Sequence, residues 1–281
     1  MKTWLITGCS SGIGKYIAKT VLEKGDNAII TARSTDRLQE LVDLFPKTAL
    51  PVALEVTNLE SIKNAIKLAK ERFGTIDVLV NNAGRGYSGA IEEGDSQAVK
   101  ELFDTNLFGP INLIKEVLPD MRLKKAGAII NISSLGVLTC DSGGGYYAAS
   151  KAALEKISVA LRKEVAPLGI KVMVVEPGPF RTNFRVSHVT GQNKNISDYA
   201  SEKKARDKLA LDPFGQKGDP QKAGKAIVAA IEKDDYPKTI LLGKGISDIG
   251  VNILTEEIQE IKKWKEIGDA TNFDEDRKSV V

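Results

Sequence analysis

Tyr147 and Lys151 form the pair of side chains with the clearest chemistry in this sequence. They stand four residues apart in a segment with helical periodicity, so both lie on one face of the predicted helix. A free phenol titrates at about 10, and a cation about 4 Å away at an effective dielectric of about 20 favours the tyrosinate by about 4 kcal/mol, or roughly three pKa units. The pair therefore predicts a general acid and base, Tyr147, that works near neutral pH. Tyr146 is the weaker candidate because Ser150 stands where its lysine would be.

A glycine-rich turn, Thr7 to Gly14, joins the first apolar run to a helix that is predicted to begin near Ile13. Glycine permits positive φ and carries no Cβ, so backbone N–H groups and the positive end of a helix can approach a pyrophosphate closely. The turn predicts a dinucleotide site, although its spacing, G-x-x-x-G-x-G, differs from the general G-x-G-x-x-G fingerprint.

The same turn also reads G-x-S-x-G, the nucleophile elbow of α/β-hydrolases, with Ser10 as the nucleophile. An elbow needs earlier strands for its oxyanion hole, whereas Ser10 follows the first predicted strand of the chain. The only histidine, His188, lies in a region without regular periodicity. Dinucleotide binding is therefore the favoured interpretation.

Short apolar runs alternate along the chain with longer segments of helical periodicity. The runs are Trp4 to Thr7, Ala28 to Ala32, Ala49 to Val56, Val78 to Asn81, Ala128 to Ser133, Val172 to Val175 and Thr239 to Leu242. Because these runs are too apolar to have a wet face, we predict a doubly wound, Rossmann-like α/β fold: a parallel sheet of about seven strands, in a single domain, with helices on both sides. In such sheets ligands bind beyond the carboxyl ends of the strands, which is where the polar motifs fall.

The stretch 180–218 interrupts this rhythm with polar and Lys-rich sequence. We predict a substrate lid there, within a dinucleotide-binding domain of residues 1–245; a solvated surface excursion is the alternative. Residues 246–281 are predicted to form a C-terminal helical extension with a frayed tail from Asp274. Its apolar residues recur at helical spacing and are expected to pack on the body of the protein. They are Leu254, Ile258, Ile261, Trp264 and Ile267.

The composition excludes several classes of protein. The net charge is only +3, and basic residues are interspersed with acidic ones, so no stripe is available to follow a nucleic-acid backbone. No segment approaches the roughly 20 apolar residues of a membrane span. Two cysteines, Cys9 and Cys140, make no disulfide framework, and the sequence starts without a signal-like apolar region, so we expect a cytoplasmic protein. No metal site is predicted.

An ordered series of motifs runs through the chain. They are the T-G-x-x-x-G-x-G turn from Thr7, Asn81-Asn82-Ala83-Gly84, Asn106, Ser134, Tyr147-x-x-x-Lys151 and Pro177-Gly178. With this order and these spacings the sequence resembles the short-chain dehydrogenase/reductase family over roughly residues 2–245. The resemblance implies an oxidoreductase that transfers a hydride between a nicotinamide dinucleotide and a carbonyl or secondary alcohol. It leaves the substrate open, because the family diverges beyond residue 180.

The resemblance also implies roles for the catalytic residues. Ser134 and Tyr147 would stabilise the substrate oxygen as it gains negative charge, and Tyr147 would deliver the proton. Ser133 is the weaker candidate for the serine. Asn106 would hold a water that connects Lys151 to solvent.

The cofactor site implied by the resemblance takes its residues from the turns that follow successive strands. They are Gly8, Ser10, Ser11, Gly12, Ile13, Gly14, Arg33, Ser34, Glu55, Val56, Asn82, Ala83, Gly84, Tyr147, Lys151, Pro177, Gly178 and Thr182. Thr182 would meet the nicotinamide carboxamide, and Glu55 stands where relatives commonly carry Asp beside the adenine ring.

The end of the second predicted strand distinguishes the two nicotinamide cofactors. Relatives that prefer NAD carry an acidic residue there for the ribose 2′-hydroxyl, whereas this chain has Ala32. Arg33 follows, and its guanidinium suits a 2′-phosphate, with Ser34 and Ser10 as further hydroxyl donors. NADP(H) is therefore predicted in preference to NAD(H).

Relatives of this type are usually dimers or tetramers, so we expect a homodimer or homotetramer paired through helices near residues 94–118 and 147–167. The apolar segment Leu135 to Leu138 and the insertion indicate a bulky, apolar small-molecule substrate. A non-catalytic NADP(H)-binding regulator or sensor with the same fold is the alternative function. The enzyme is favoured because all four catalytic residues are present.

Overall fold

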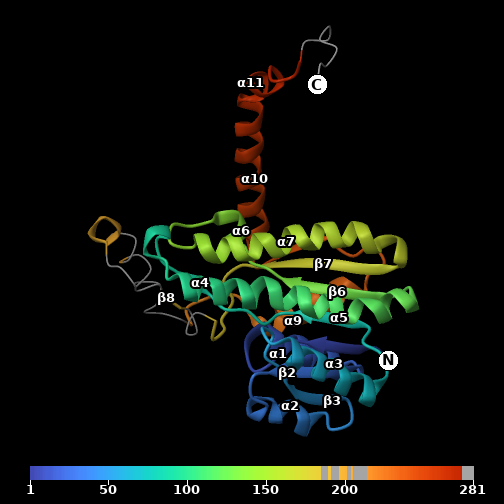
Figure 1. Ribbon diagram of the computed structural model, residues 1–281. Helices are drawn as coiled ribbons and strands as arrows, with labels where there is room; N and C mark the ends of the chain where they lie inside the picture. The colour runs from blue at the N-terminus through green and yellow to red at the C-terminus, as the bar shows by residue number, and fades with distance from the viewer. Residues whose placement is uncertain (185–188, 191–195, 201–203, 205–213, 274–281) are drawn as a thin grey trace.

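The computed structural model describes residues 1–184, 189–190, 196–200, 204 and 214–273. Its centre is a seven-stranded parallel sheet of order β3-β2-β1-β4-β6-β7-β9 (Figure 1). The strands are β1 (Thr3–Ile6), β2 (Asn27–Ala32), β3 (Ala49–Ala53), β4 (Val78–Asn81), β6 (Gly127–Ile132), β7 (Ile170–Pro177) and β9 (Thr239–Leu242). A second, two-stranded sheet pairs β5 (Tyr87–Ser88) with β8 (Val189–Thr190). The predicted doubly wound α/β fold in a single domain is confirmed.

Helices connect the strands of the main sheet. The α-helices are α1 (Gly12–Glu23), α2 (Gln39–Leu44), α3 (Leu59–Phe73), α4 (Ser96–Phe103), α5 (Gly109–Lys124), α6 (Gly136–Thr139), α7 (Gly145–Val165), α9 (Pro220–Glu232), α10 (Ile246–Lys263) and α11 (Lys265–Asp269). Shorter turns are η1 (Asp36–Leu38), η2 (Ile91–Glu93), η4 (Ala166–Leu168) and η5 (Ser197–Tyr199), of 3-10 type, and η3 (Asp104–Phe108), a π turn.

Successive strand residues build two separate cores, one on each face of the sheet. Trp4 and Ile6 of β1 belong to the same core as Ile17 of α1 and Ile227 of α9. Leu5, which lies between them in sequence, belongs to the opposite core with residues of α3, α5 and α7. Helices therefore cover both faces (Figure 1). A sheet covered on both faces requires strands that are apolar almost throughout, which is the pattern seen in the sequence.

Two strands differ in length from the prediction by more than one residue. β3 ends at Ala53 rather than at Val56, because its pairing with β2 ends at Ala32 and Ala53. β7 is longer than the predicted Val172 to Val175, because it pairs with β6 on one side and with β9 on the other. The longer strand brings Glu176 to the sheet edge where the polar motifs gather.

The two ends of the polar stretch predicted as a lid lie together. Phe180 and Gly218 form an isolated β-bridge. Between them, the Ile196 N–H donates a hydrogen bond to Glu93 Oε1 at 3.0 Å, which joins this stretch to η2. His188 and much of the stretch lie outside the described residues. The lid and the domain limits therefore stay predictions.

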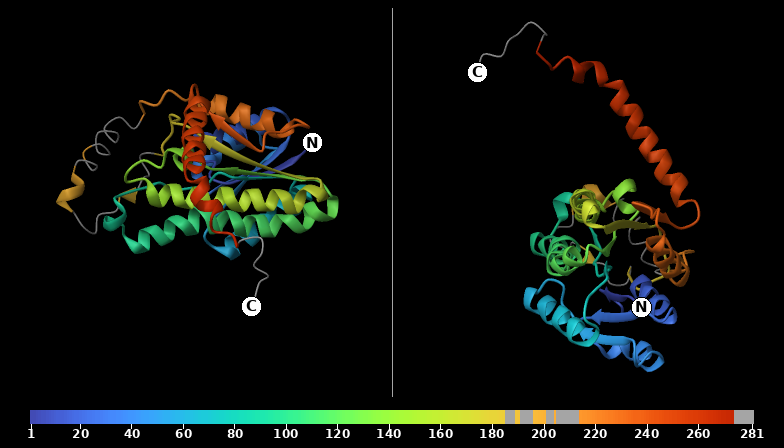
Figure 2. Two further views of the ribbon diagram at one scale, coloured as in Figure 1. Left: turned by 90° about the horizontal axis from the view of Figure 1, so that it is seen from above. Right: turned by 90° about the vertical axis from the view of Figure 1, so that its right-hand side faces the viewer.

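Beyond its first turns the C-terminal helix does not pack on the body of the protein, so the prediction that its apolar residues pack there was wrong. α10 begins beside β9, where Ile246 and Gly250 are buried, and then projects away from the sheet (Figures 1 and 2). The apolar residues that were expected to pack are exposed, from 45% for Leu254 to 71% for Ile261. The helix also ends at Lys263, and α11 follows as a separate short helix. Helical spacing identifies an apolar face but contains no information about what covers it.

No helix in the described part of the chain, α10 included, is long and apolar enough to cross a membrane. Cys9 is buried and Cys140 is exposed, and both are free thiols. The end of the chain from Asp274, which was predicted to be frayed, lies outside the described residues.

Candidate active site

A cavity of about 850 Å³ opens at the carboxyl ends of β1, β2, β4, β6 and β7. Cavities of this size are typical of cofactor and small-molecule sites. Most of the predicted site residues line it: Gly8, Ser10, Ser11, Gly12, Ile13, Arg33, Glu55, Val56, Asn82, Ala83, Gly84, Ser134, Tyr147, Lys151, Pro177, Gly178 and Thr182. Gly14, Ser34 and Asn106 are not among the lining residues.

The glycine turn between β1 and α1 fits a phosphate group. Gly8 and Gly12 adopt positive φ angles of 73° and 60°, which only glycine reaches without strain. Ser11 is the N-cap residue of α1, but its side chain makes no capping hydrogen bond, and the first turn holds no acidic residue. The N-termini of α3, α4 and α9, by contrast, have side-chain caps. The first N–H groups of α1 are therefore left for an anion at the cavity wall.

Gly14 supports the turn from outside the cavity. A Cβ atom on Gly14 would lie 2.3 Å from Asn82 Nδ2, so no larger residue fits there. Asn82 Nδ2 donates hydrogen bonds to Thr7 O at 2.8 Å and to Gly8 O at 3.2 Å. These bonds join the end of β4 to the turn after β1. Position 14 is therefore a glycine because it packs closely against Asn82, and not because it lines the cavity.

Two arginines lie where the cavity extends beyond β2. Arg33 and Arg37 both line it and are exposed. Ala32, at the position where an acid would bind a ribose 2′-hydroxyl, is buried. Ser34 is turned to its own loop, since its hydroxyl donates to Asp36 Oδ2 at 2.8 Å. Sequence reasoning missed Arg37, which η1 brings to the cavity.

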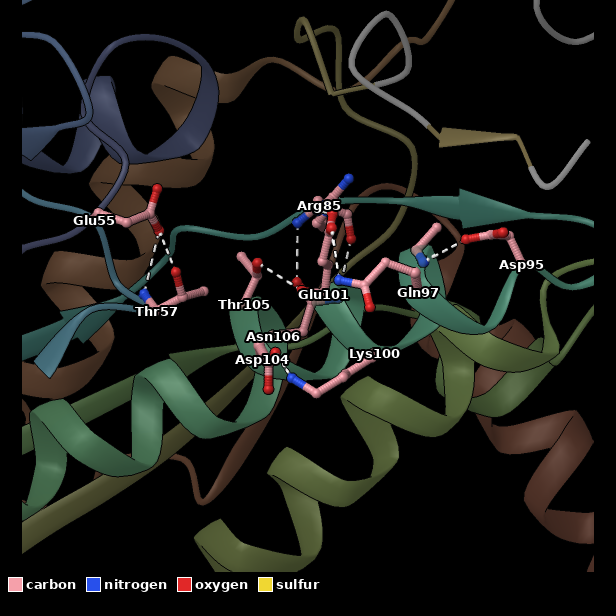
Figure 3. Close-up of polar contacts among 11 residues, drawn as sticks. Glu55, Thr57, Arg85, Asp95, Gln97, Lys100, Glu101, Asp104, Thr105 and Asn106 are labelled. Carbon is pink, nitrogen blue, oxygen red and sulfur yellow. Dashed lines mark hydrogen bonds and ion pairs between the residues drawn. The ribbon is translucent and has the colours of Figure 1, made fainter.

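Glu55 lines the cavity after β3, and its carboxylate closes a local turn (Figure 3). Oε1 accepts hydrogen bonds from the N–H and the hydroxyl of Thr57, at 3.2 and 3.1 Å. The Glu55 N–H donates to Ser61 Oγ at 3.0 Å. Glu55 therefore shapes the rim of the cavity, and its contact with an adenine ring stays a prediction.

Ser134 and Tyr147 meet where the chain passes from β6 to α7. The Ser134 hydroxyl accepts a hydrogen bond from the Gly136 N–H at 3.0 Å and shares one with the Tyr147 phenol. The Tyr147 ring lies 5.8 Å from the Phe184 ring, measured between centroids. Burial raises the pKa of Tyr147 to about 12, and the bond with Ser134 lowers it by less. The shift runs opposite to the expected one, because desolvation of the phenolate outweighs the favourable contacts.

Lys151 lies one helical turn after Tyr147 on α7, and its side chain is buried. Its Nζ donates a hydrogen bond to Ile132 O, at the end of β6, at 2.8 Å. Burial lowers the pKa of Lys151 to about 8, whereas the negative charge of Glu155 acts to raise it. The ammonium therefore reaches the cavity wall from inside the protein, beside the tyrosine.

Asn106 lies behind this wall, fully buried in the π turn η3. Its Oδ1 accepts a hydrogen bond from the Arg85 N–H at 2.9 Å, and its Nδ2 donates to Arg85 O at 3.0 Å (Figure 3). Nδ2 also donates to Ser150 Oγ at 3.0 Å. These bonds connect the segment after β4 to α7. π turns within helices occur frequently at functional sites. The water-binding role of Asn106 stays a prediction.

Sequence reasoning missed several polar residues of the cavity. Arg85 Nη1 pairs with Glu101 Oε2 at 2.8 Å, and both residues line the cavity near η3 (Figure 3). Gln216 lines it from the returning end of the polar stretch. These residues belong to no local motif, because only the fold brings them to the cavity.

The chain matches the short chain dehydrogenase family model over residues 2–193. The structure of a short-chain dehydrogenase from Streptomyces avermitilis is 39% identical in sequence with a TM-score of 0.89, and the match covers 96% of this chain and 98% of that one. Oxidoreductase BOA17 of Botryotinia fuckeliana (strain B05.10) is 33% identical over 267 residues, 95% of this chain and 97% of that protein. A serine dehydrogenase solved in complex with NADP+ is 26% identical with a TM-score of 0.74, covering 85% of this chain and 94% of that one.

These similarities are not confined to a motif. The family model includes the glycine turn, the sheet as far as β7 and the segment with Tyr147 and Lys151. The match to the Streptomyces structure extends over nearly the whole chain. The chain therefore belongs to the short-chain dehydrogenase family of oxidoreductases.

Proposed function

We propose that this protein transfers a hydride between NADP(H) and a small-molecule carbonyl or secondary alcohol, with Tyr147 as the general acid and base. One observation carries the proposal. Ser134, Tyr147 and Lys151 line the same cavity as the uncapped start of α1. A nicotinamide bound there would supply the hydride donor or acceptor.

In carbonyl reduction, Ser134 and Tyr147 donate hydrogen bonds to the substrate oxygen and stabilise the negative charge that develops on it. Tyr147 is protonated at neutral pH, because its pKa is about 12, and transfers its proton to that oxygen. The Lys151 ammonium, one turn away on α7, stabilises the tyrosinate that results. In alcohol oxidation the tyrosinate is the base, so that direction is favoured by rising pH.

The two arginines beyond β2 favour NADP(H) over NAD(H). Arg33 and Arg37 offer two cations to a 2′-phosphate, while Ala32 offers no acceptor to a ribose 2′-hydroxyl. The related serine dehydrogenase was solved with NADP+, which supports the same choice.

Aromatic side chains in the cavity support a substrate with an apolar portion. Phe180 and Phe184 line the cavity, and Phe184 stacks obliquely against Tyr147. The apolar segment Leu135 to Leu138 is not part of the lining, and Leu138 packs instead near Gly250 of α10. Phe180 and Phe184, not the segment Leu135 to Leu138, are therefore the apolar surface that we assign to the substrate.

We also propose that the protein is a homodimer or homotetramer. Phe108 in η3 is 51% exposed, and Ile157 on α7 is 42% exposed. Both lie on the segments that were expected to pair, and exposed apolar residues are common at such interfaces. Light scattering of the purified protein at its working concentration gives the mass, and a monomeric mass would contradict the proposal.

The cofactor is tested by measuring the affinity for NADPH and for NADH in wild type, Arg33→Ala and Arg122→Ala. Arg122 is an exposed arginine of α5 that does not line the cavity, so it is a matched control. One charge-assisted contact contributes about 1.5–3 kcal/mol, so NADPH affinity should fall roughly tenfold or more in Arg33→Ala. It should be unchanged in Arg122→Ala. Equal wild-type affinities for the two cofactors would contradict the NADP(H) assignment.

The reaction is tested by following NADPH consumption with a panel of alkyl and aryl ketones, and NADPH formation with the matching secondary alcohols. Turnover in either direction supports the enzyme. Tight NADPH binding without turnover on either panel would favour the non-catalytic regulator.

A further inference from the structure

A polar seam runs along the face of α7 that packs on β6 and β7. From Tyr147 onward, Lys151, Glu155, Ser158 and Arg162 follow at intervals of three or four residues, so they share this face. Hydrogen bonds join four of them to the sheet: Lys151 to Ile132 O, Glu155 to Ser133 Oγ, Ser158 to Asn131 Nδ2 and Arg162 to Val172 O. The catalytic end of α7 thus continues into buried polar contacts to which the proposed reaction assigns no part.

Glu155 is the acid in this seam, one turn beyond Lys151. Its Oε1 accepts a hydrogen bond from the Ser133 hydroxyl, and Ser133 is buried just after β6. The preceding residue, Ile132, provides the carbonyl oxygen that accepts the bond from Lys151 Nζ. Two adjacent residues therefore bind the ammonium and the carboxylate, which form no direct ion pair with each other in the described structure; the charge of Glu155 acts on Lys151 through space.

Glu176 reaches the same region from β7. Ile132 pairs with Val175 in the register of β6 and β7, so Ser133 and Glu176 follow as neighbours. Alternation along β7 puts Glu176 on the side of Val172, which belongs to the core beneath α7. Glu176 is only 4% exposed, and its Oε2 is buried without a hydrogen-bond partner.

Two carboxyl groups and one ammonium therefore influence one another where α7 packs on β6 and β7: Lys151 and Glu176 are buried, and Glu155 is half-buried. Burial and the charge of Glu155 raise the pKa of Glu176 to about 7. Burial also raises the pKa of Glu155. The hydrogen bond from Ser133 and the positive charges of Lys156 and Lys151 on α7 lower that pKa, but by less. Glu176 therefore holds a proton below about pH 7.

We propose that Glu155 is a positioning residue for the reaction proposed above: its negative charge balances the buried Lys151 ammonium and keeps it protonated beside Tyr147. The hydrogen bond from the Ser133 hydroxyl favours that charge on Glu155. Without the negative charge of Glu155, burial would favour the neutral amine of Lys151. A neutral lysine does not stabilise a tyrosinate, so Tyr147 would act as a base only at higher pH.

A double-mutant cycle on the cofactor-free protein tests the charge balance. The variants are Glu155→Gln, Lys151→Met and the double variant, and the measurement is Tm at pH 7. Glu155→Gln should lower Tm by about 3 °C or more while Lys151 is present, because a buried ammonium loses its counter-charge, and by less than about 1 °C when residue 151 is Met.

Glu164→Gln is the matched control, since Glu164 lies on the exposed face of the same helix. It should change Tm in neither background. An equal loss of Tm from Glu155→Gln in both backgrounds would show that Glu155 only anchors Ser133, and the proposal would be overturned.

The pH profile of alcohol oxidation tests the link to the reaction. In Glu155→Gln the rising limb of kcat/KM should move up by about one pH unit, because Tyr147 loses the support of a protonated lysine. Glu155→Asp and Glu164→Gln should keep the wild-type profile. A Glu155→Gln profile that coincides with wild type overturns the proposal. If wild-type protein turns over neither ketones nor alcohols, the proposed function fails, while the cycle above still decides the role of Glu155.

Discussion

Helices α7 and α10 both carry amphipathic sequences, yet the fold uses their faces in opposite ways. α7 lies along β6 and β7 and buries a polar seam that includes Lys151 and Ser158 (Figure 1). α10 is held at its first turns and exposes an apolar stripe that includes Ile258 and Ile261 (Figure 2). A buried polar group is costly unless its partners are supplied, and α7 has those partners in β6. Helical periodicity therefore reports that two faces differ, but not which face the protein buries.

The largest expected effect is at the catalytic end of α7. Tyr147→Phe removes the proton donor, so kcat/KM should fall by about 10³-fold, while NADPH affinity should stay close to wild type. Tyr146→Phe is the control, because the Tyr146 hydroxyl donates to Ile91 O at 2.8 Å on the neighbouring face. Steady-state kinetics and NADPH fluorescence measure the two effects. Turnover that survives in Tyr147→Phe would remove Tyr147 from the mechanism.

The second prediction applies one substitution to both helices. Leu154 of α7 is 1% exposed and Leu254 of α10 is 45% exposed. Leu154→Ala leaves a cavity and should lower the free energy of unfolding by about 2–5 kcal/mol. Leu254→Ala should change it by less than about 0.5 kcal/mol. Urea unfolding measures both. A comparable loss for Leu254→Ala would mean that another surface covers the α10 stripe in solution.

The third and smallest prediction concerns pH and Glu176. Its folded pKa, about 7, lies above its ordinary value of 4.5, so the folded state binds more protons between these values. The stability that this protonation contributes is complete below about pH 4.5 and is lost as pH rises through 7. Glu176→Gln does not titrate, so its stability relative to wild type should grow by up to about 3 kcal/mol between pH 5 and 8.

Thermal unfolding at pH 5, 6, 7 and 8 of wild type, Glu176→Gln and the surface control Glu164→Gln measures this difference. A Glu176→Gln advantage that does not change with pH would show that Glu176 is ionised in the folded protein.

Much of the fold was predictable because the signals for it are local. The alternation of apolar runs and helical segments indicates a parallel sheet with two covered faces. The glycine turn requires positive φ at Gly8 and Gly12, which glycine alone adopts readily. The four-residue spacing of Tyr147 and Lys151 places both at one cavity, since a helix repeats about every 3.6 residues.

Other parts of the site depend on which elements pack together. Arg37 comes to the cavity through η1, and Arg85 and Gln216 through loops, so no local pattern marks them. Glu176 comes to lie near Glu155 only because β7 pairs with β6 beneath α7. These contacts are non-local, and sequence spacing contains no information about them.

By itself, the sequence determined the class of fold, the glycine turn after β1 and the chemical type of the residues in the cavity, because each rests on backbone geometry within a few turns of chain. Only the tertiary structure decided the protonation of those residues and the exposure of α10. The pKa of Tyr147 rises although Lys151 follows one turn later, because burial outweighs the contacts that favour its charged form. Desolvation and packing are set by neighbours that are distant in sequence, so they appear only when the chain is folded.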